Sequence, residues 1–259
     1  MSHPEQRLFF EEALRRVSAV SSEIRRVLEI GAYDVNGEVR GLFSGLDDYV
    51  GVDLVEGPGV DVVSYGHELG QEYNGFDAVV AAETFEHDQY WVETFRRMVE
   101  AAVPGGWVIV TCASLGRPEH GTERADLDKS PGTANRGLNY YKNISRTELY
   151  DEAIKYPFVF FQAVYMPWSF DLYFWGKLES NADTQGINFD TLRFEKKSLV
   201  RISRVMPLAQ KIVRLPIMAM VKIFRNQDTL NEAVHLYWKN LGRLSRSLGF
   251  RHLESRPFV

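Results

Sequence analysis

The chain has 259 residues, of which 45% are hydrophobic and 25% are charged. Its single cysteine, Cys112, excludes an internal disulfide framework and is typical of a protein in a reducing compartment. The net charge of −5 is unevenly distributed along the chain, since residues 191–259 hold 14 basic and 4 acidic residues and the main part is acidic. An acidic main part argues against general nucleic-acid binding, whereas the basic tail leaves an anionic partner open. No apolar stretch is long enough to span a membrane and the charged N-terminus does not resemble a secretory signal, so we expect a cytoplasmic protein without a transmembrane segment.

In chain order, the first expected element is a helix over residues 4–20, and the next is a short strand over residues 27–30 that ends in a glycine loop. A small amphipathic helix near residues 39–43 follows. Only residues 54–59 join the second and third strands, so we expect a reduced turn there instead of a crossover helix. Alternating strands and helices predict a mostly parallel sheet with both faces covered. The remaining elements expected in this half are strands over residues 49–53, 60–63, 76–81 and 107–112, a helix over residues 89–103 and a turn over residues 104–106.

The second half begins with a segment, residues 113–143, that shows no period. A loop of that length inside a compact domain indicates a functional or a disordered segment. Ser145 and Glu148 then form a capping box for a helix that ends near residue 156. Strands over residues 158–166 and 172–178, joined by a tight link, predict an antiparallel pair.

The tail from about residue 189 onward has a helical, apolar and basic pattern, which Pro207 and Pro216 are expected to interrupt. Three roles fit this pattern: a cap packed on the domain, a homodimer interface, or a surface helix on anionic lipid. Burial against protein is favoured, because the two prolines divide the segment into pieces too short to bind lipid strongly.

The first chemically informative feature is Glu29-Ile30-Gly31, where the first strand ends in a sharp turn. Such a turn lets backbone amides and a helix N-terminus approach a ligand closely. Asp53, at the end of the next strand, is placed to accept both hydroxyls of a ribose. Many doubly wound proteins share these features, and in the alternative interpretation the glycines serve only turns and Asp53 is a solvated strand end.

Four segments make the pattern more specific, because they occur as an ordered set. They are VLEIGAYDVNG from residue 27, YVGVDL from residue 49, FDAVVAAETFEH from residue 76 and VPGGWVIVTC from residue 103. As a set, they resemble the class I S-adenosylmethionine-dependent methyltransferases over residues 26–113. The resemblance implies a Rossmann-like α/β fold with a seven-stranded, mostly parallel sheet whose last strand is reversed. A nicotinamide-dinucleotide protein fits less well, because the full G-x-G-x-x-G fingerprint is absent.

The resemblance also implies where S-adenosylmethionine binds. Glu29 and Gly31 would lie beside its methionine part, which the backbone around Ala81 would line, while Asp53 holds the ribose hydroxyls and Leu54 packs on the adenine. The cofactor-binding residues implied in this way are Glu29, Gly31, Ala32, Asp34, Asp53, Leu54, Tyr65, Gly66, Ala81 and Ala82.

The chain departs from the family pattern at two places. The family's first loop has further glycines, one of them where this chain has Tyr33, so Asp34 and Asn36 are expected to bond either the cofactor or their own backbone. The acidic residue that often receives the adenine amine is replaced by Tyr65. Either Tyr65 stacks on the base or the backbone near Gly66 takes that role.

Catalysis by such a protein consists mainly of positioning, because the methyl donor is an activated sulfonium, but an acceptor hydroxyl would still need a base. The candidate bases are His87, His120 and Glu83. The alternatives are that His87 is a structural histidine and that His120 is an exposed loop histidine without a role. Glu83, Glu86 and His87 resemble the metal-binding triplet of quinone-biosynthesis O-methyltransferases, yet the triplet also occurs in relatives without metal, and we expect no metal.

Together these patterns predict a methyltransferase domain that binds S-adenosylmethionine over residues 1–180 and a helical C-terminal extension over residues 181–259, packed on the domain or at a dimer interface. The expected reaction is methyl transfer to a small-molecule or glycan-type acceptor, with oxygen as the target atom. Two alternatives stay open. One is a non-catalytic protein that binds S-adenosylmethionine, and the other is a peripheral membrane or nucleic-acid partner that acts through the basic tail.

Overall fold

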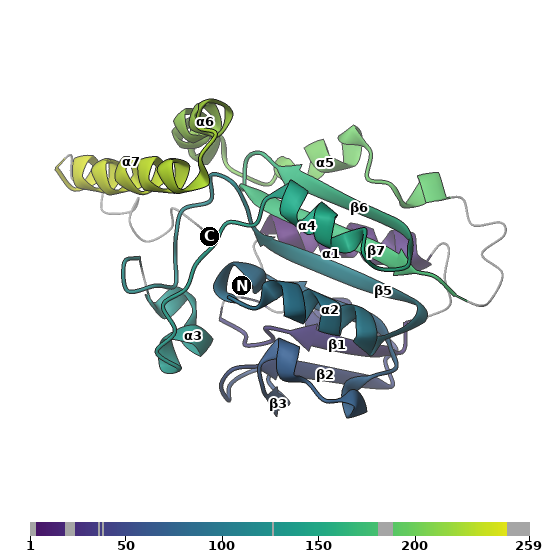
Figure 1. Ribbon diagram of the computed structural model, residues 1–259. Coiled ribbons are helices and arrows are strands. Elements are labelled where there is room, and N and C mark those ends of the chain that lie inside the picture. Colours follow the sequence, from purple (N-terminus) through teal and green to yellow (C-terminus); the bar gives the residue numbers. More distant parts are fainter. Residues whose placement is uncertain are drawn as a thin grey trace.

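The computed structural model describes residues 4–18, 24–35, 37, 39–125, 127–180 and 189–247. Its centre is a seven-stranded sheet in the order β3-β2-β1-β4-β5-β7-β6 (Figure 1). Strand β7 is antiparallel to both of its neighbours, and the other pairs are parallel. The predicted Rossmann-like fold class is therefore confirmed. The strands are β1 (Arg26–Ile30), β2 (Asp48–Asp53), β3 (Val62–Val63), β4 (Phe76–Ala82), β5 (Ala102–Ala113), β6 (Phe158–Met166) and β7 (Asp171–Leu178).

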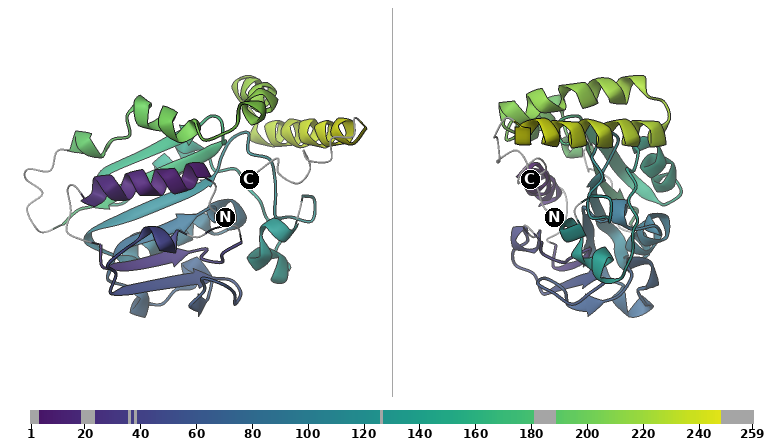
Figure 2. Two further views of the ribbon diagram at one scale, coloured as in Figure 1. Left: turned by 180° about the vertical axis from the view of Figure 1, so that it is seen from behind. Right: turned by 90° about the vertical axis from the view of Figure 1, so that its left-hand side faces the viewer.

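Helices cover both faces of this sheet, as the front and back views show (Figures 1 and 2). Each helix turns an apolar stripe toward the strands, and on one face Phe9 stacks on Tyr173 of β7 with the ring centroids 4.6 Å apart. Covering both faces explains why the central strands have continuous apolar runs. The helices are α1 (Pro4–Ser18) and α5 (Lys196–Ser203) on the first face, and α2 (Trp91–Ala101) and α4 (Arg146–Ala153) on the second.

Most predicted elements are present, including the helix-free link between β2 and β3 and the antiparallel pair β6 and β7. The capping box is also confirmed: the Ser145 hydroxyl accepts the Glu148 amide at 3.2 Å, and the Glu148 carboxylate accepts the Ser145 amide at 2.9 Å. The small helix expected near residues 39–43 is a single 3-10 turn, Arg40–Leu42. The predicted turn at residues 104–106 is wrong, since these residues belong to β5. Gly105 takes a left-handed φ of 79° there, which lets the strand bulge without leaving the sheet.

Over residues 189–247 the tail forms three α-helices, α5, α6 (Leu208–Ile223) and α7 (Gln227–Ser247). Pro207 precedes α6, but the expected break at Pro216 is wrong, because this proline lies inside α6. A proline removes one backbone hydrogen bond, and the inner face of the helix is held by packing on both sides of it. Ile217 is fully buried there, in a cluster with Phe170 of the β6–β7 link.

Candidate functional site

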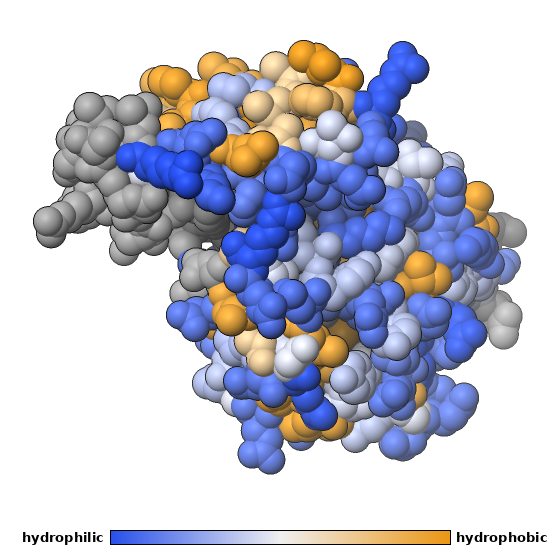
Figure 3. Space-filling view, turned by 60° about the vertical axis from the view of Figure 1, so that its left-hand side comes forward, coloured by the Kyte–Doolittle hydropathy of each residue, from blue (hydrophilic) through white to orange (hydrophobic). Residues whose placement is uncertain are grey.

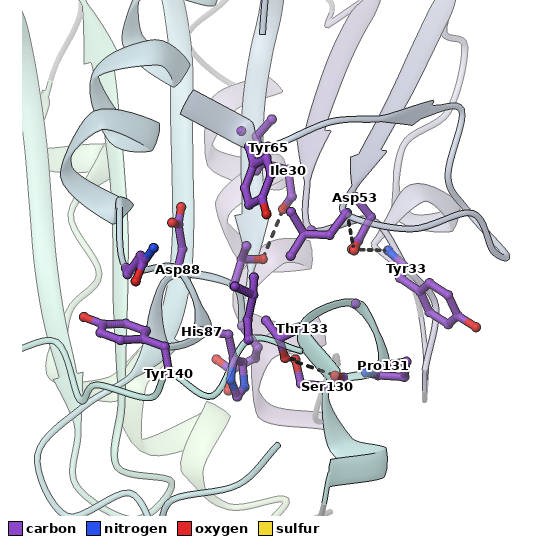
Figure 4. Close-up of a pocket in the computed structure, with 18 of the residues that line it drawn as sticks. Ile30, Tyr33, Asp53, Tyr65, His87, Asp88, Ser130, Pro131, Thr133 and Tyr140 are labelled. Carbon is purple, nitrogen blue, oxygen red and sulfur yellow. Dashed lines mark hydrogen bonds between the residues drawn. The ribbon is translucent and has the colours of Figure 1, made fainter. Parts of the chain in front are cut away.

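A cavity of about 220 Å³ lies at the edge of the sheet where the parallel strands end (Figure 4). The carboxyl ends of parallel strands are the place where open α/β sheets bind ligands. The loops after β1, β2, β3 and β4 line one side of the cavity. The other side is formed by the long segment 113–143, which is ordered where described and contains the short helix α3 (Pro131–Asn135). The segment without sequence period is thus a wall of the pocket.

The loop after β1 brings bare backbone to this cavity. Gly31 has a φ of 79°, and a Cβ at this position would lie 2.0 Å from Oγ1 of Thr84, so only glycine fits. The Thr84 hydroxyl donates to the carbonyl of Ile30 at 3.1 Å. The amides of Gly31 and Ala32 both donate to the carbonyl of Val52, which ties the loop to β2. The main chain can therefore approach a ligand here without an intervening side chain.

Asp53 ends β2 and presents its carboxylate to the same cavity. Its Oδ2 accepts the Tyr33 amide at 3.0 Å and its Oδ1 accepts the Leu54 amide at 2.7 Å (Figure 4). Burial raises the pKa of Asp53, and these two hydrogen bonds counter that effect. Gly132 of α3 is so close that a Cβ on it would lie 2.6 Å from Oδ1. The carboxylate is thus fixed in position, with lone pairs left for further donors.

Two histidines meet at the other side of the cavity. His87 comes from the 3-10 turn Phe85–His87 after β4, and His120 comes from the long segment. Their rings meet edge to face with centroids 5.0 Å apart, and both contact Tyr141. The alternative of an exposed loop histidine is therefore wrong for His120, because the segment folds back over His87. Burial lowers the pKa of His87 to about 3 and that of His120 well below its usual value, so both rings are neutral near pH 7.

Glu83, the third candidate base, is buried at the end of β4 with a φ of 54°, a strained conformation for a residue other than glycine. The Gln6 amide of α1 donates to its Oε1 at 2.5 Å, and Arg117 lies 3.8 Å from its Oε2. Burial raises the pKa of Glu83 well above its usual value, and the nearby Asp171 carboxylate adds to the effect. Its side chain is therefore held by neighbours, although it borders the cavity.

A buried ionic cluster lies behind Glu83. Arg117 is 3.3 Å from Asp171 and donates to the Ser169 carbonyl at 3.0 Å. Arg214 of α6 extends into the same region and donates to the Trp168 carbonyl at 2.7 Å. The C-terminal extension thus supplies a buried cation close to the site.

Half of the predicted cofactor-binding residues and all three candidate bases line the cavity. Those residues are Gly31, Asp53, Leu54, Tyr65, Gly66, His87, His120 and Glu83. The predicted positions outside the lining are Glu29, Ala32, Asp34, Ala81 and Ala82.

Each of those five has a physical reason to stay out of the cavity. The Glu29 carboxylate accepts the Tyr49 hydroxyl at 2.6 Å, and Asp34 accepts the Gly37 amide at 2.7 Å, so Asp34 bonds its own backbone. The three alanines, Ala32, Ala81 and Ala82, are buried in or beside the sheet. Asn36 lies outside the described residues.

Sequence reasoning missed two neighbours of the site. Gln6 reaches it from α1, and Arg117 reaches it from the long segment. No period or motif marks these residues. The only available signal was the unusual length of that segment.

Comparison with known proteins gives likeness in structure alone: no family model and no curated protein matches the sequence. The chain is similar to the N-methyltransferase NodS from Bradyrhizobium japonicum, at 14% identity and a TM-score of 0.45, over 69% of this chain and 99% of that one. It is also similar to the 1,6-didemethyltoxoflavin-N1-methyltransferase of Burkholderia thailandensis, at 16% identity and a TM-score of 0.46, over 68% of this chain and 80% of that one. A third similar structure is phosphoethanolamine N-methyltransferase 2 of Haemonchus contortus, at 17% identity and a TM-score of 0.45, over 90% of this chain and 48% of that one.

Proposed function

We propose that this protein is an S-adenosylmethionine-dependent methyltransferase. One observation carries the proposal, namely the convergence of three features in a single cavity at the carboxyl edge of the sheet. These are the bare backbone at Gly31 after β1, the fixed carboxylate of Asp53 after β2, and the neutral rings of His87 and His120 beyond β4. The first two suit the donor, and the histidines suit an acceptor.

The residues of the cavity fit the parts of this cofactor. The Asp53 carboxylate can accept the two ribose hydroxyls while its backbone donors hold it in place. Leu54 and Tyr65 supply an apolar and an aromatic wall for the adenine. The main chain at Gly31 leaves room for the methionine part, because no side chain stands between it and the cavity.

When bound, S-adenosylmethionine supplies a methyl group on a positively charged sulfur that needs no further activation. The protein's share is to hold the acceptor in line and to exclude water, for which the segment 113–143 forms the outer wall. Burial keeps His87 and His120 neutral near pH 7, so each ring retains a nitrogen lone pair that can accept a hydrogen bond from an acceptor hydroxyl and orient its oxygen. This chemistry supports transfer to oxygen. Tyr90 and Tyr140 add aromatic surface, which suits a small-molecule or glycan-type acceptor.

The test is a crystal structure of the protein with S-adenosylhomocysteine. We expect both ribose hydroxyls to bond to Asp53, the adenine to lie beside Leu54 and Tyr65, and the sulfur to face the side of the cavity that holds His87 and His120. A nucleoside bound outside this cavity, or one whose adenine occupies the histidine side, would contradict the proposal.

A second function, attachment to an anionic lipid surface, is favoured by the outer face of α6. Leu208 and Ile212 are 73% and 57% exposed there, and Leu215 and Ile223 continue the exposed stripe. Figure 3 shows this hydrophobic surface at the top of the molecule, with hydrophilic residues beside it. Apolar surface of this extent is typical of an interaction site. No helix among the described residues is long and apolar enough to cross a membrane, so the contact would be peripheral.

Charge decides between a lipid surface and a second copy of the chain. Residues 196–225 hold eight basic residues, of which only Arg214 is buried, and no acidic one. In a two-fold dimer this face would meet itself, and like charges would be brought together. A bilayer with anionic headgroups offers the opposite charge beside an apolar interior, and each basic residue near such a surface adds about 1 kcal/mol. The observations therefore favour the lipid surface.

Vesicle sedimentation measures this attachment. We expect the protein to bind vesicles of phosphatidylcholine with phosphatidylserine and not pure phosphatidylcholine, and Ile212→Asp to weaken binding roughly tenfold or more, since it places a charge in the apolar contact. Ile154→Asp is the matched control, because Ile154 is also 57% exposed but lies at the end of α4. Equal loss in both variants, or a stable dimer in light scattering that Ile212→Asp dissociates, would overturn the lipid assignment.

A further inference from the structure

Three potential metal ligands lie together at the histidine side of the cavity: Glu86, His87 and His120. Their ligand atoms all lie within 4.8 Å of one another. Glu86 and His87 are neighbours in the 3-10 turn after β4. His120 comes from a segment more than thirty residues later and meets His87 ring against ring. The tertiary fold, not a sequence motif, therefore assembles this cluster.

The hydrogen bonds of the two imidazoles leave each ring one nitrogen with a lone pair for a ligand. His120 places Nδ1 3.1 Å from the Pro118 carbonyl, which fixes the proton on Nδ1 and leaves Nε2 as an acceptor. The His87 ring donates to the backbone of Tyr140, while its Nδ1 has no hydrogen-bond partner. A histidine that binds a metal commonly donates its other nitrogen to a backbone carbonyl in this way.

The carboxylate of Glu86 is the group in the cluster that most needs a partner for its charge. Its side chain is fully buried, and no side chain among the described residues donates a hydrogen bond to either oxygen. A buried carboxylate whose oxygens accept no side-chain hydrogen bond is costly, and a bound cation would offset that cost.

Glu83, which the sequence pattern groups with Glu86 and His87, does not belong to the cluster. Gln6 and Arg117 hold its two oxygens, as described above. The structure therefore replaces the carboxylate of the sequence triplet with the imidazole of His120.

We propose that Glu86, His87 and His120 bind one divalent transition-metal ion. Two imidazoles and one carboxylate suit Zn²⁺, Fe²⁺, Co²⁺ or Mn²⁺, whereas Mg²⁺ and Ca²⁺ prefer oxygen ligands alone. His87 and His120 both line the cavity, so the open positions of the ion face the space given to the acceptor. An ion with three protein ligands and an open side binds an oxygen of a substrate and lowers the pKa of a bound hydroxyl.

This site narrows the acceptor to molecules with an oxygen that can bind a metal, such as a phenol, a vicinal diol or a hydroxy acid. That consequence rests on the proposed methyl transfer. Binding of the ion itself does not, because its ligands are distinct from Asp53 and Gly31.

The experiment uses untagged full-length protein, treated with a chelator and titrated with Co²⁺ without S-adenosylmethionine. We expect one ion per chain, visible in the absorption bands of bound Co²⁺. His120→Ala and Glu86→Gln should each weaken binding at least tenfold, since changes even to outer-shell partners cost roughly 10–100-fold. His235→Ala on α7 is the control and should bind as the natural chain does. Circular dichroism verifies that each variant is folded.

The outcomes separate the two proposals. A folded natural chain that takes up no Co²⁺, or binding that persists in both cluster variants, overturns the metal site, whatever the variants do to stability. Calorimetry with S-adenosylmethionine on the metal-free protein then tests the proposed function alone. Co²⁺ binding without cofactor binding overturns methyl transfer and leaves the metal site standing, and the reverse result overturns only the metal site.

Discussion

Replacement of Arg117 by Met is expected to lower the free energy of unfolding by about 3–5 kcal/mol. Arg117 is almost fully buried and is the cation nearest to Glu83 and Asp171, whose carboxylates are buried with it. Methionine keeps most of the side-chain volume but removes the charge, so two buried carboxylates lose their counter-ion. Urea denaturation measures the loss. Arg96→Met is the control, because Arg96 lies on the surface in a pair with Glu100 and should change stability by less than about 1 kcal/mol.

The same variant makes a prediction about pH. The Arg117 cation lowers the pKa of both Glu83 and Asp171, while burial raises both, so its removal raises their folded-state pKa further. The folded variant then binds more protons than the natural protein. The difference in stability should therefore be largest near pH 8 and shrink as the pH falls toward 5, where protonated carboxyls need no cation. A difference that is independent of pH, or no larger than that of Arg96→Met, would contradict this account of the cluster.

Local patterns predicted much of the fold. Each of these confirmed predictions concerns residues that are neighbours in the chain. The structure contains the strands that the apolar patterns predicted, the capping box at Ser145 and the tight link before β7. The errors have a physical source as well. Pro216 stays inside α6 because Ile217 and its neighbours are held by tertiary packing, which a local rule for proline does not include.

The residues that a strand end places were predictable from the order of the strands. Gly31 follows β1 directly and Asp53 is the last residue of β2, so their common edge follows from the parallel sheet. The fold-back that sets His120 on His87 depends on the path of a segment without periodicity. Gln6 reaches Glu83 across 77 positions of the chain, a separation that no spacing rule covers.

Calorimetric titration with S-adenosylmethionine, S-adenosylhomocysteine and NAD⁺ tests the central claim most directly, in the natural protein and in Asp53→Ala. We expect both sulfur nucleosides to bind and NAD⁺ not to bind, because the loop after β1 lacks the glycine fingerprint for a pyrophosphate. Loss of two charge-assisted hydrogen bonds in Asp53→Ala should cost about 2–4 kcal/mol, or roughly 30- to 1000-fold in affinity.

Asp47→Ala serves as the matched control, because Asp47 ends the loop before β2 and is an exposed partner of Arg25. It should bind the cofactor as the natural chain does. Micromolar binding of S-adenosylmethionine that is lost in Asp53→Ala and kept in Asp47→Ala is the result this account predicts. No heat with either sulfur nucleoside, or an affinity unchanged by Asp53→Ala, would contradict it.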